Sequence, residues 1–241
     1  MFLKEKQLLN YFKILKIKKN DKLFIHGNSM ALFQIYGKNA KVKTDLFWNC
    51  LKNFLGNNGT IIVPTFTYSL GKNRIYNKHK SKSKVGQFSE DFRKNFSKVR
   101  SNDPLFSISA LGNDIKKIGN LSYKNSFGKN SIFDYLYLNN VKILCLGCEL
   151  DVVTFLHYIE QDINVPYREF KYFNTYSKNY SGKIKNERIN FFCRIKKRKY
   201  NYNLNPLIKE MKKRNKISII RFGRLKSYIF NSKDLYNICK K

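Results

Sequence analysis

The sequence predicts an α/β fold, because short apolar runs alternate with amphipathic segments along the first two-thirds of the chain. The runs that are typical of buried strands cover residues 22–26, 60–63, 105–111 and 141–146. The chain has 241 residues, of which 42% are hydrophobic and 15% aromatic, which is enough to bury a large core. It shows no internal repeat and no linker, so residues 1–241 are expected to form a single domain.

Helices are expected where apolar side chains recur every three or four residues. On this basis they cover residues 3–17, 44–55, 85–96, 113–118, 131–138 and 151–161. Pro64 ends the strand at residues 60–63, because proline cannot donate a hydrogen bond within a sheet. Gly112 ends the strand at residues 105–111. Residues 69–84 are polar and rich in lysine, which indicates a surface loop.

The last third of the chain is basic and rich in tyrosine. Residues 189–195 and 216–230 have the pattern of antiparallel strands, and residues 207–214 and 233–239 that of helices. Residues 168–226 hold nineteen Lys and Arg against three Glu, and the whole chain carries a net charge of +32. A field of this sign attracts phosphates, nucleotides, nucleic acid or acidic membranes. A coding bias towards AT-rich codons, which enriches lysine, explains the same excess without a partner, and both interpretations stay open.

Neither membrane insertion nor secretion is indicated. No apolar run approaches the ~18 residues of a membrane span, and the N-terminus lacks the apolar stretch of a secretory signal. Five cysteines, an odd number, favour reduced thiols in a cytoplasmic protein. Cys145 and Cys148 form a C-x-x-C pair, but no second pair or neighbouring histidine completes a zinc site. We expect both as small buried residues, and we expect no metal ion.

The turn after the first strand is one candidate for a binding site. Gly27, Asn28, Ser29 and Met30 follow the strand at residues 22–26 and open a helix, with Asn28 or Ser29 as its cap. Such a turn exposes backbone N–H groups that can hold a phosphate or a carbonyl oxygen. It matches neither a dinucleotide-binding fingerprint nor a phosphate-binding loop, and an ordinary tight turn is the alternative.

A histidine on a predicted helix is the second candidate. Thr154, His157 and Glu160 are spaced three residues apart, so they project from one helix face. A histidine held by a carboxylate is the usual arrangement of a general base. The alternative is an ordinary pair of polar side chains on a helix surface.

Asp103 is the third candidate. It stands with Pro104 at the entrance of a strand that begins near Ser107, where a carboxylate could bind a cationic group of a substrate. An aspartate before proline is equally a common turn former. The residues leave these two roles open.

Five segments, taken together and in this order, resemble the aminoglycoside 3-N-acetyltransferase family. The most specific are Gly-Thr-Ile-Ile-Val-Pro-Thr-Phe-Thr at residues 59–67 and the His-x-x-Glu helix after Leu-Gly-Cys-Glu-Leu-Asp in residues 146–160. The other segments cover residues 23–29, 100–112 and 126–133. The resemblance extends over roughly residues 20–170.

This resemblance implies a three-layer α/β/α fold with a mixed central sheet, distinct from the GNAT acetyltransferases, and acetyl-CoA as the acyl donor. It implies that His157 matches the catalytic histidine of the family and Glu160 the acid one helical turn later. The backbone at Gly27, Asn28, Ser29 and Met30 then meets the acyl donor, with Thr65 beside it. Asp103 and Ser107 are expected near the acceptor.

Two departures from the family pattern bear on the acceptor. The drug-modifying members typically have His-Ser-Ser where this chain has His26-Gly27-Asn28-Ser29, and a histidine where it has Asp103. We therefore expect an amino sugar linked to a nucleotide, for surface-glycan synthesis, with an aminoglycoside antibiotic as the alternative. A basic nucleic-acid-binding protein, using residues 194–202, is the alternative of another class.

In the expected mechanism, His157 accepts the proton of the attacking amine, and Glu160 or Asp103 orients the imidazole or the ammonium group. Backbone N–H groups near residues 28–30, or the Thr65 hydroxyl, would stabilise the oxyanion.

Overall fold

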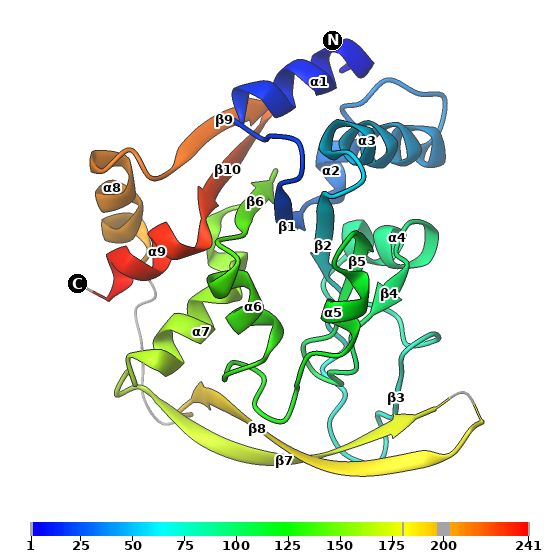
Figure 1. The fold of residues 1–241 in the computed structure, drawn as a ribbon, viewed down its shortest axis with the longest axis vertical. Coiled ribbons are helices and arrows are strands. Elements are labelled where there is room, and N and C mark those ends of the chain that lie inside the picture. The colour runs from blue at the N-terminus through cyan, green and yellow to red at the C-terminus, as the bar shows by residue number, and fades with distance from the viewer. Residues whose placement is uncertain (1, 180, 197–202, 241) are drawn as a thin grey trace.

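The computed structural model describes residues 2–179, 181–196 and 203–240. Seven strands form its central sheet (Figure 1). In sheet order they are β4 (Val99–Arg100), β5 (Ile108–Gly112), β2 (Thr60–Pro64), β1 (Lys22–Gly27), β6 (Lys142–Leu146), β10 (Leu225–Asn231) and β9 (Ser218–Phe222). Strand β1 is parallel to β2 and β6, and the remaining pairs are antiparallel, so the sheet is mixed.

Helices cover both faces of this sheet. One layer contains α1 (Glu5–Ile14), α2 (Ser29–Leu32), α3 (Ala40–Leu55) and α4 (Gln87–Asn95). The other contains α5 (Ile115–Gly119), α6 (Ile132–Leu138), the 3-10 turn η1 (Leu150–Val152), α7 (Phe155–Asp162), α8 (Asn205–Lys213) and α9 (Ser232–Cys239). The alternation of strand side chains separates two cores, because Ile25 packs with Trp48 on one face and Phe24 with Phe133 on the other. The predicted three-layer α/β/α fold with a mixed sheet is confirmed.

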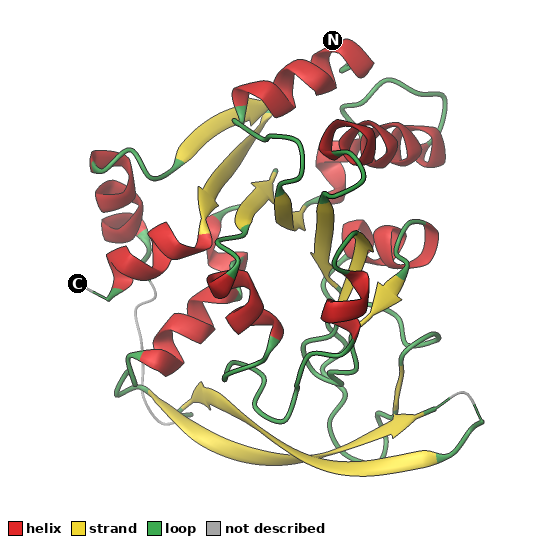
Figure 2. Cartoon of the chain, viewed as in Figure 1, coloured by secondary structure: helices red, strands yellow, loops and turns green. Residues whose placement is uncertain are grey.

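A second, three-stranded sheet lies beyond one end of the main sheet (Figures 1 and 2). It consists of β3 (Tyr76–Asn77), β7 (Arg168–Lys178) and β8 (Ile184–Arg194), and β7 and β8 form a long antiparallel ribbon. Ile189 and Phe192 are buried, and Phe173 stacks on Phe191 with 5.0 Å between ring centroids. Ile189 belongs to the core of the α6 and α7 layer, which anchors the ribbon to the main domain.

The structure corrects several predicted elements. Residues 216–230 are two strands, β9 and β10, because Gly223 adopts a positive φ of 57° and turns the chain. They pair with each other, in a different sheet from β8. The helix predicted at residues 151–161 begins at Phe155, after η1. Residues 105–107 lie outside β5, in and just after a turn at residues 104–106, and β3 lies in the predicted loop at residues 69–84.

The sequence analysis did not identify β7. Its lysines and aromatic residues show no clean alternation, because the aromatic Phe170 and Tyr172 stand on the exposed side, where polar residues are expected. In the basic run at residues 194–202, residues 197–202 lie outside the described part of the chain. Within the described part, no helix is both long and apolar enough to span a membrane.

Candidate active site

A cavity of about 340 Å³ lies at the carboxyl ends of the parallel strands β1, β2 and β6. This is where ligands bind in sheets of this kind, because the turns that leave parallel strands meet at one edge. The lining residues come from four segments and are His26, Gly27, Pro64, Phe66, Tyr68, Val85, Ser89, Cys148, Asp151, Val152, Thr154 and His157.

The two residues of the predicted base lie one turn apart on α7 and contact each other. His157 Nδ1 is 2.7 Å from Glu160 Oε2, and the His157 ring packs edge-on against Phe127 with 5.5 Å between centroids. His157 and Thr154 line the cavity, whereas Glu160 is buried behind them. The predicted spacing of three residues therefore brings the imidazole and the carboxylate together.

Two residues at the start of β7 complete this cluster. The Tyr167 hydroxyl donates to Glu160 Oε1 at 2.8 Å, and Arg168 Nε forms an ion pair with Glu160 Oε2 at 2.9 Å. Arg168 Nη2 lies 2.9 Å from His157 Nδ1, and its Nη1 donates to the Phe192 carbonyl at 3.1 Å. The carboxylate of Glu160 is thus fixed from three sides.

The electrostatics of the cluster set the protonation of His157. Burial lowers its pKa, the hydrogen bond with Glu160 opposes that shift, and the Arg168 charge adds to it, so the net pKa is lowered and the ring is neutral at neutral pH. Burial acts to raise the pKa of Glu160, but the hydrogen bond with His157 and the Arg168 charge lower it overall. The ionised Glu160 carboxylate can only accept and the Arg168 guanidinium can only donate, so Nδ1 serves one of them at a time. In the tautomer in which Nδ1 donates to Glu160, the His157 Nε2 atom carries the lone pair of a general base.

The turn after β1 borders the same cavity. Gly27 lines it, and a Cβ at this position would lie 2.5 Å from the Phe88 ring, so no side chain fits. The Asn28 side chain accepts from the Met30 N–H at 3.0 Å and caps α2, so Asn28, and not Ser29, is the cap of the two that were predicted. The Asn28 N–H donates to the Leu146 carbonyl at 3.0 Å.

Among the described residues, no partner is found for the Ser29 N–H. Ser29 does not line the cavity at His157; it lines a second cavity, of about 350 Å³, between α2, α3 and α4. The Met30 side chain is exposed.

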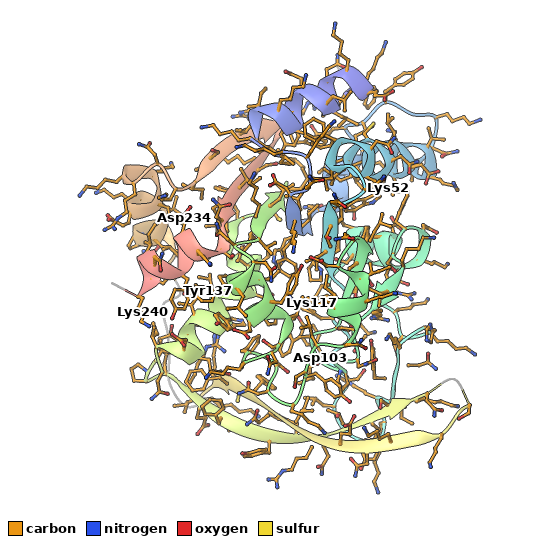
Figure 3. All side chains as sticks on the ribbon, in the orientation of Figure 1. Lys52, Asp103, Lys117, Tyr137, Asp234 and Lys240 are labelled. Atoms are coloured by element: carbon orange, nitrogen blue, oxygen red, sulfur yellow. The ribbon has the colours of Figure 1, made fainter. Side chains whose placement is uncertain are left out.

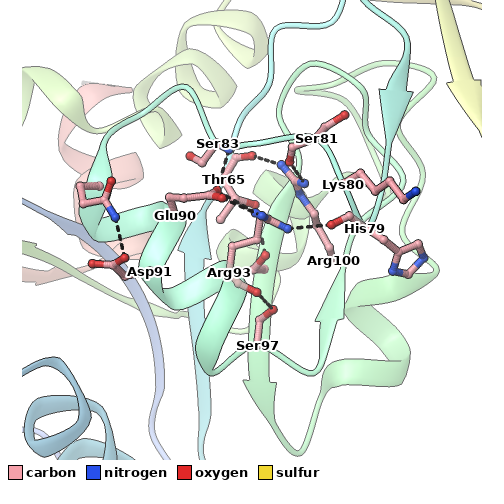
Figure 4. A network of polar contacts seen from close by, with 12 residues as sticks. Thr65, His79, Lys80, Ser81, Ser83, Glu90, Asp91, Arg93, Ser97 and Arg100 are labelled. Atoms are coloured by element: carbon pink, nitrogen blue, oxygen red, sulfur yellow. Dashed lines mark hydrogen bonds and ion pairs between the residues drawn. The ribbon is translucent and has the colours of Figure 1, made fainter. Parts of the chain in front are cut away.

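Thr65 lies beside the cavity but is fully buried. Its hydroxyl donates to the Ser107 carbonyl at 3.2 Å, and the Ser107 hydroxyl donates to the Thr65 carbonyl at 2.8 Å. Arg100 donates to the Thr65 carbonyl at 2.6 Å and to the Ser81 carbonyl at 2.5 Å (Figure 4). Arg93 pairs with Glu90 in the same network. Thr65 and Ser107 thus have their hydrogen bonds satisfied within the protein, and their roles towards ligands stay predictions.

Asp103 is buried among the loops between the main sheet and the ribbon (Figure 3). Its Oδ1 accepts from the N–H groups of Leu105 and Phe106 at 2.7 and 2.9 Å. Burial raises its pKa to about 6, although the two backbone donors act to lower it. Asp103 does not line the cavity that contains His157. The structure brings His157, Glu160 and the Gly27 turn together and leaves Asp103 behind the cavity wall, so its predicted contact with substrate is untested.

The sequence analysis missed four residues of the site. His26 lies at the end of β1 on the cavity wall with 5% exposure, and burial lowers its pKa to about 3. Arg168 and Tyr167 could not be associated with Glu160 without the position of β7. Tyr68 also lines the cavity. Only His26, one residue before the candidate turn, had a sequence signal.

The C-x-x-C pair is divided by the turn after β6. Cys145 is fully buried in the sheet, whereas Cys148 is partly exposed and lines the cavity. In the described part of the chain, no group of three His, Cys, Asp or Glu side chains could hold a metal ion.

A neutral imidazole, oriented by a carboxylate beside a cavity at the strand ends, is an arrangement that enzymes use for general-base catalysis. The sequence model of the aminoglycoside 3-N-acetyltransferase family matches residues 25–241, and the chain belongs to this family. The family, the N-acetyltransferase activity and acetyl-CoA as the acyl donor, all predicted from the sequence, are thereby confirmed.

Solved structures with the same fold are distant in sequence. Aminoglycoside acetyltransferase AAC(3)-Xa has a TM-score of 0.83 at 15% identity, over 98% of this chain and 91% of that chain. AAC-IIIb, solved with CoASH, has a TM-score of 0.82 at 17% identity, over 99% of this chain and 95% of that chain. The YokD protein from Bacillus subtilis has a TM-score of 0.81 at 18% identity, over 100% and 93%. No curated protein is similar enough in sequence to count as a match.

Proposed function

We propose that the protein transfers the acetyl group of acetyl-CoA to an amine of an aminoglycoside-type amino sugar, with His157 as general base. The observation that carries this proposal is the pair of His157 and Glu160, 2.7 Å apart, with the imidazole neutral and on the wall of the cavity. Glu160 and Arg168 are positioning residues in this scheme, because they act through the imidazole.

The need for a base follows from the chemistry of the acceptor. A sugar amine is largely protonated at neutral pH, and only the free amine attacks a thioester. The ammonium group first loses one proton to solvent, and the free amine binds. His157 Nε2 then takes a second proton from the amine nitrogen as this nitrogen bonds to the thioester carbon, and the Ser29 N–H is the proposed donor to the oxyanion. When the C–S bond breaks, the protonated His157 returns its proton to the departing sulfur. The products are an amide and free CoA, and no side chain carries the acetyl group.

The acyl donor is proposed to lie across the turn at residues 27–30. This turn separates the cavity at His157 from the second cavity, which Ser29, Lys41 and Lys43 line. The two lysines would favour the phosphates of CoA near them, although Lys41 also forms an ion pair with Asp45 at 2.5 Å. The cytoplasm is the proposed compartment, because acetyl-CoA is available there.

The acceptor class is supported by the family, whose name specifies the 3-amino group of aminoglycosides. The relative AAC-VIa was solved with the aminoglycoside sisomicin. It has a TM-score of 0.81 to this chain at 16% identity, over 99% of this chain and 96% of that chain. Modification of such drugs would make the protein an antibiotic-resistance enzyme, which is part of the proposal.

A nucleotide-linked amino sugar for surface-glycan synthesis is the second candidate acceptor. The net charge of +32 favours it, because this field repels a polycationic drug and attracts a sugar diphosphate. Asp151 is the one acidic residue among those that line the cavity, which leaves little negative charge to bind several ammonium groups.

Mass spectrometry of acceptor panels separates the two candidates. The protein is incubated with acetyl-CoA and either aminoglycosides or nucleotide-linked amino sugars, and each product is searched for the mass of an added acetyl group. Acetylated aminoglycoside supports the main proposal, and acetylated nucleotide sugar alone supports the second. If neither panel is acetylated while released CoA stays at the level without protein, the proposed function is wrong.

A further inference from the structure

Tyr68 has an unusual backbone conformation on the wall of the cavity. Its φ is 49°, in the left-handed region. Of the seven non-glycine residues with positive φ in the described part of the chain, five are asparagines, one is Lys16 and one is Tyr68. Asparagine tolerates this region, whereas a bulky aromatic residue does not. Such a conformation persists only where the surroundings hold it, and it is common at ligand sites.

Two backbone carbonyls hold Tyr68 in place. The N–H groups of Thr67 and Tyr68 donate to the Leu105 carbonyl at 3.2 and 3.1 Å, and the Ser69 N–H donates to the Pro104 carbonyl at 2.9 Å. The Thr67 hydroxyl also donates to the Pro104 carbonyl, at 2.6 Å. Three successive residues are therefore fixed by one short turn.

Asp103 holds the turn that contains Pro104 and Leu105. Its Oδ1 accepts from the N–H groups of Leu105 and Phe106, and its side chain is buried away from the cavity. The carboxylate therefore acts on the position of Tyr68 through two layers of hydrogen bonds and does not itself touch a ligand in the cavity.

The result is an aromatic ring that faces solvent at the site. Tyr68 is 40% exposed and lines the same cavity as His157. Its ring rests edge-on against Phe66 and Phe106, each with 5.9 Å between centroids. Burial raises the pKa of its phenol, which stays protonated at neutral pH.

We infer that Tyr68 binds the acceptor, by packing its ring against the apolar C–H face of an amino-sugar ring, and that Asp103 is the residue that positions it. A rigid aromatic side chain binds a ring at small cost in conformational entropy. The inference rests on the proposed function, since it names the residue that selects the acceptor. It applies to either acceptor class, because both present a six-membered amino-sugar ring.

Steady-state kinetics of Tyr68→Ala and Tyr68→Phe test the ring. Tyr68→Ala is expected to raise the KM of the acceptor about tenfold, the loss that ~1.4 kcal/mol of ring packing gives. The KM of acetyl-CoA should not change, and Tyr68→Phe, which keeps the ring, should be close to wild type. An unchanged acceptor KM in Tyr68→Ala, or an equal rise in both KM values, would overturn the inference.

Asp103→Ala and Asp103→Asn test the positioning role. Asp103→Asn keeps an oxygen for the two backbone donors and should keep the wild-type acceptor KM, whereas Asp103→Ala should raise it as Tyr68→Ala does. If Asp103→Ala does not fold, Thr67→Val replaces it, because it removes the hydroxyl that donates to the Pro104 carbonyl of the same turn. A folded Asp103→Ala or Thr67→Val enzyme with wild-type acceptor KM would contradict the positioning role.

Calorimetric titration separates this inference from the proposed function. Sisomicin or a nucleotide-linked amino sugar is titrated into the protein loaded with CoA. Weaker binding to Tyr68→Ala than to wild type supports the inference, whatever the turnover. Wild-type turnover with equal binding by Tyr68→Ala refutes this inference alone, and wild type that neither binds nor acetylates either probe refutes both.

Discussion

Two buried carboxylates, Glu160 at the junction of α7 and β7 and Asp103 in the turn before β5, have opposite surroundings. Glu160 meets the Arg168 guanidinium, a tyrosine hydroxyl and the His157 ring, and its net pKa is lowered. Asp103 accepts from two backbone N–H groups, and burial raises its pKa to about 6. The difference arises from the partners of Glu160, first the His157 hydrogen bond and then the Arg168 charge, which compensate for the water that burial removes.

This comparison separates a carboxylate that contacts an imidazole from one that holds a backbone turn. Glu160 contacts the imidazole of His157, and this imidazole lines the cavity. Asp103 is hydrogen-bonded to backbone N–H groups of a turn and does not line the cavity. From the sequence both residues were candidates for orienting a proton or an ammonium group, and burial alone does not distinguish them.

The largest expected effect on kcat comes from replacing His157, whose imidazole lines the cavity. His157→Ala should lower kcat by about 10²–10⁴-fold, because general-base assistance is typically worth that much. His79→Ala, which removes an exposed histidine from the loop before α4, is the matched control. Single-turnover rates of acetyl transfer measure both variants. A His157→Ala rate close to wild type would remove His157 from the mechanism.

Glu160→Gln should affect both stability and catalysis. It leaves the buried Arg168 charge unpaired, at a cost of about 3 kcal/mol in unfolding free energy. The amide can also donate to His157 Nδ1, which moves the ring proton to Nε2 and lowers kcat about tenfold or more. Urea unfolding and kcat are measured beside Glu169→Gln, a partly exposed glutamate on β7 that pairs with Lys171 at 2.6 Å. Equal stability in the two variants would show that the ion pair contributes nothing.

Asp103→Asn should raise the free energy of unfolding at neutral pH, whereas Glu160→Gln should lower it. The native pKa of Asp103, about 6, exceeds the ordinary value of 3.8, so the folded state binds more protons between these pH values. The contribution of Asp103 to the free energy of unfolding is present below pH 4 and is lost as the pH rises to 6. The full shift corresponds to at most about 3 kcal/mol. Urea unfolding at pH 4 and 7 should show wild type losing stability relative to Asp103→Asn; a constant difference would contradict the raised pKa.

Arg168→Gln should move the pH dependence of acetyl transfer. The Arg168 charge contributes to the lowered pKa of His157, so its removal raises that pKa. His157 must be neutral to act as a base, and the acidic limb of the kcat/KM profile should therefore shift to higher pH. The profile is compared with that of Arg188→Gln, whose arginine packs on the Tyr172 ring elsewhere in the ribbon. An unshifted limb would separate Arg168 from the base.

Cys148→Ser should have the smallest effect. The thiol lines the cavity, but the proposed transfer has no acetyl-enzyme, so serine should keep kcat within about twofold of wild type. Rates of acetyl transfer and intact-protein mass after incubation with acetyl-CoA alone provide the measurement. Complete loss of activity, or an acetylated wild type that Cys148→Ser lacks, would establish a covalent route.

The sequence was most informative where the site depends on local geometry. The spacing of His157 and Glu160 follows from helical periodicity, and the capping role of Asn28 from the residue types after a strand. Arg168 and Tyr68 depend on tertiary structure: the first on the path of the ribbon, the second on a backbone angle that neighbouring carbonyls impose. Neither property has a local pattern, and β7 itself lacks the alternation of a half-buried strand.

The close approach of Gly27 and Phe88 couples these two positions. The Phe88 ring occupies the space that a side chain at position 27 would need. A larger residue at position 27 therefore requires that the ring shifts or that a smaller residue replaces Phe88, so changes at the edge of the cavity are transmitted to the packing of α4.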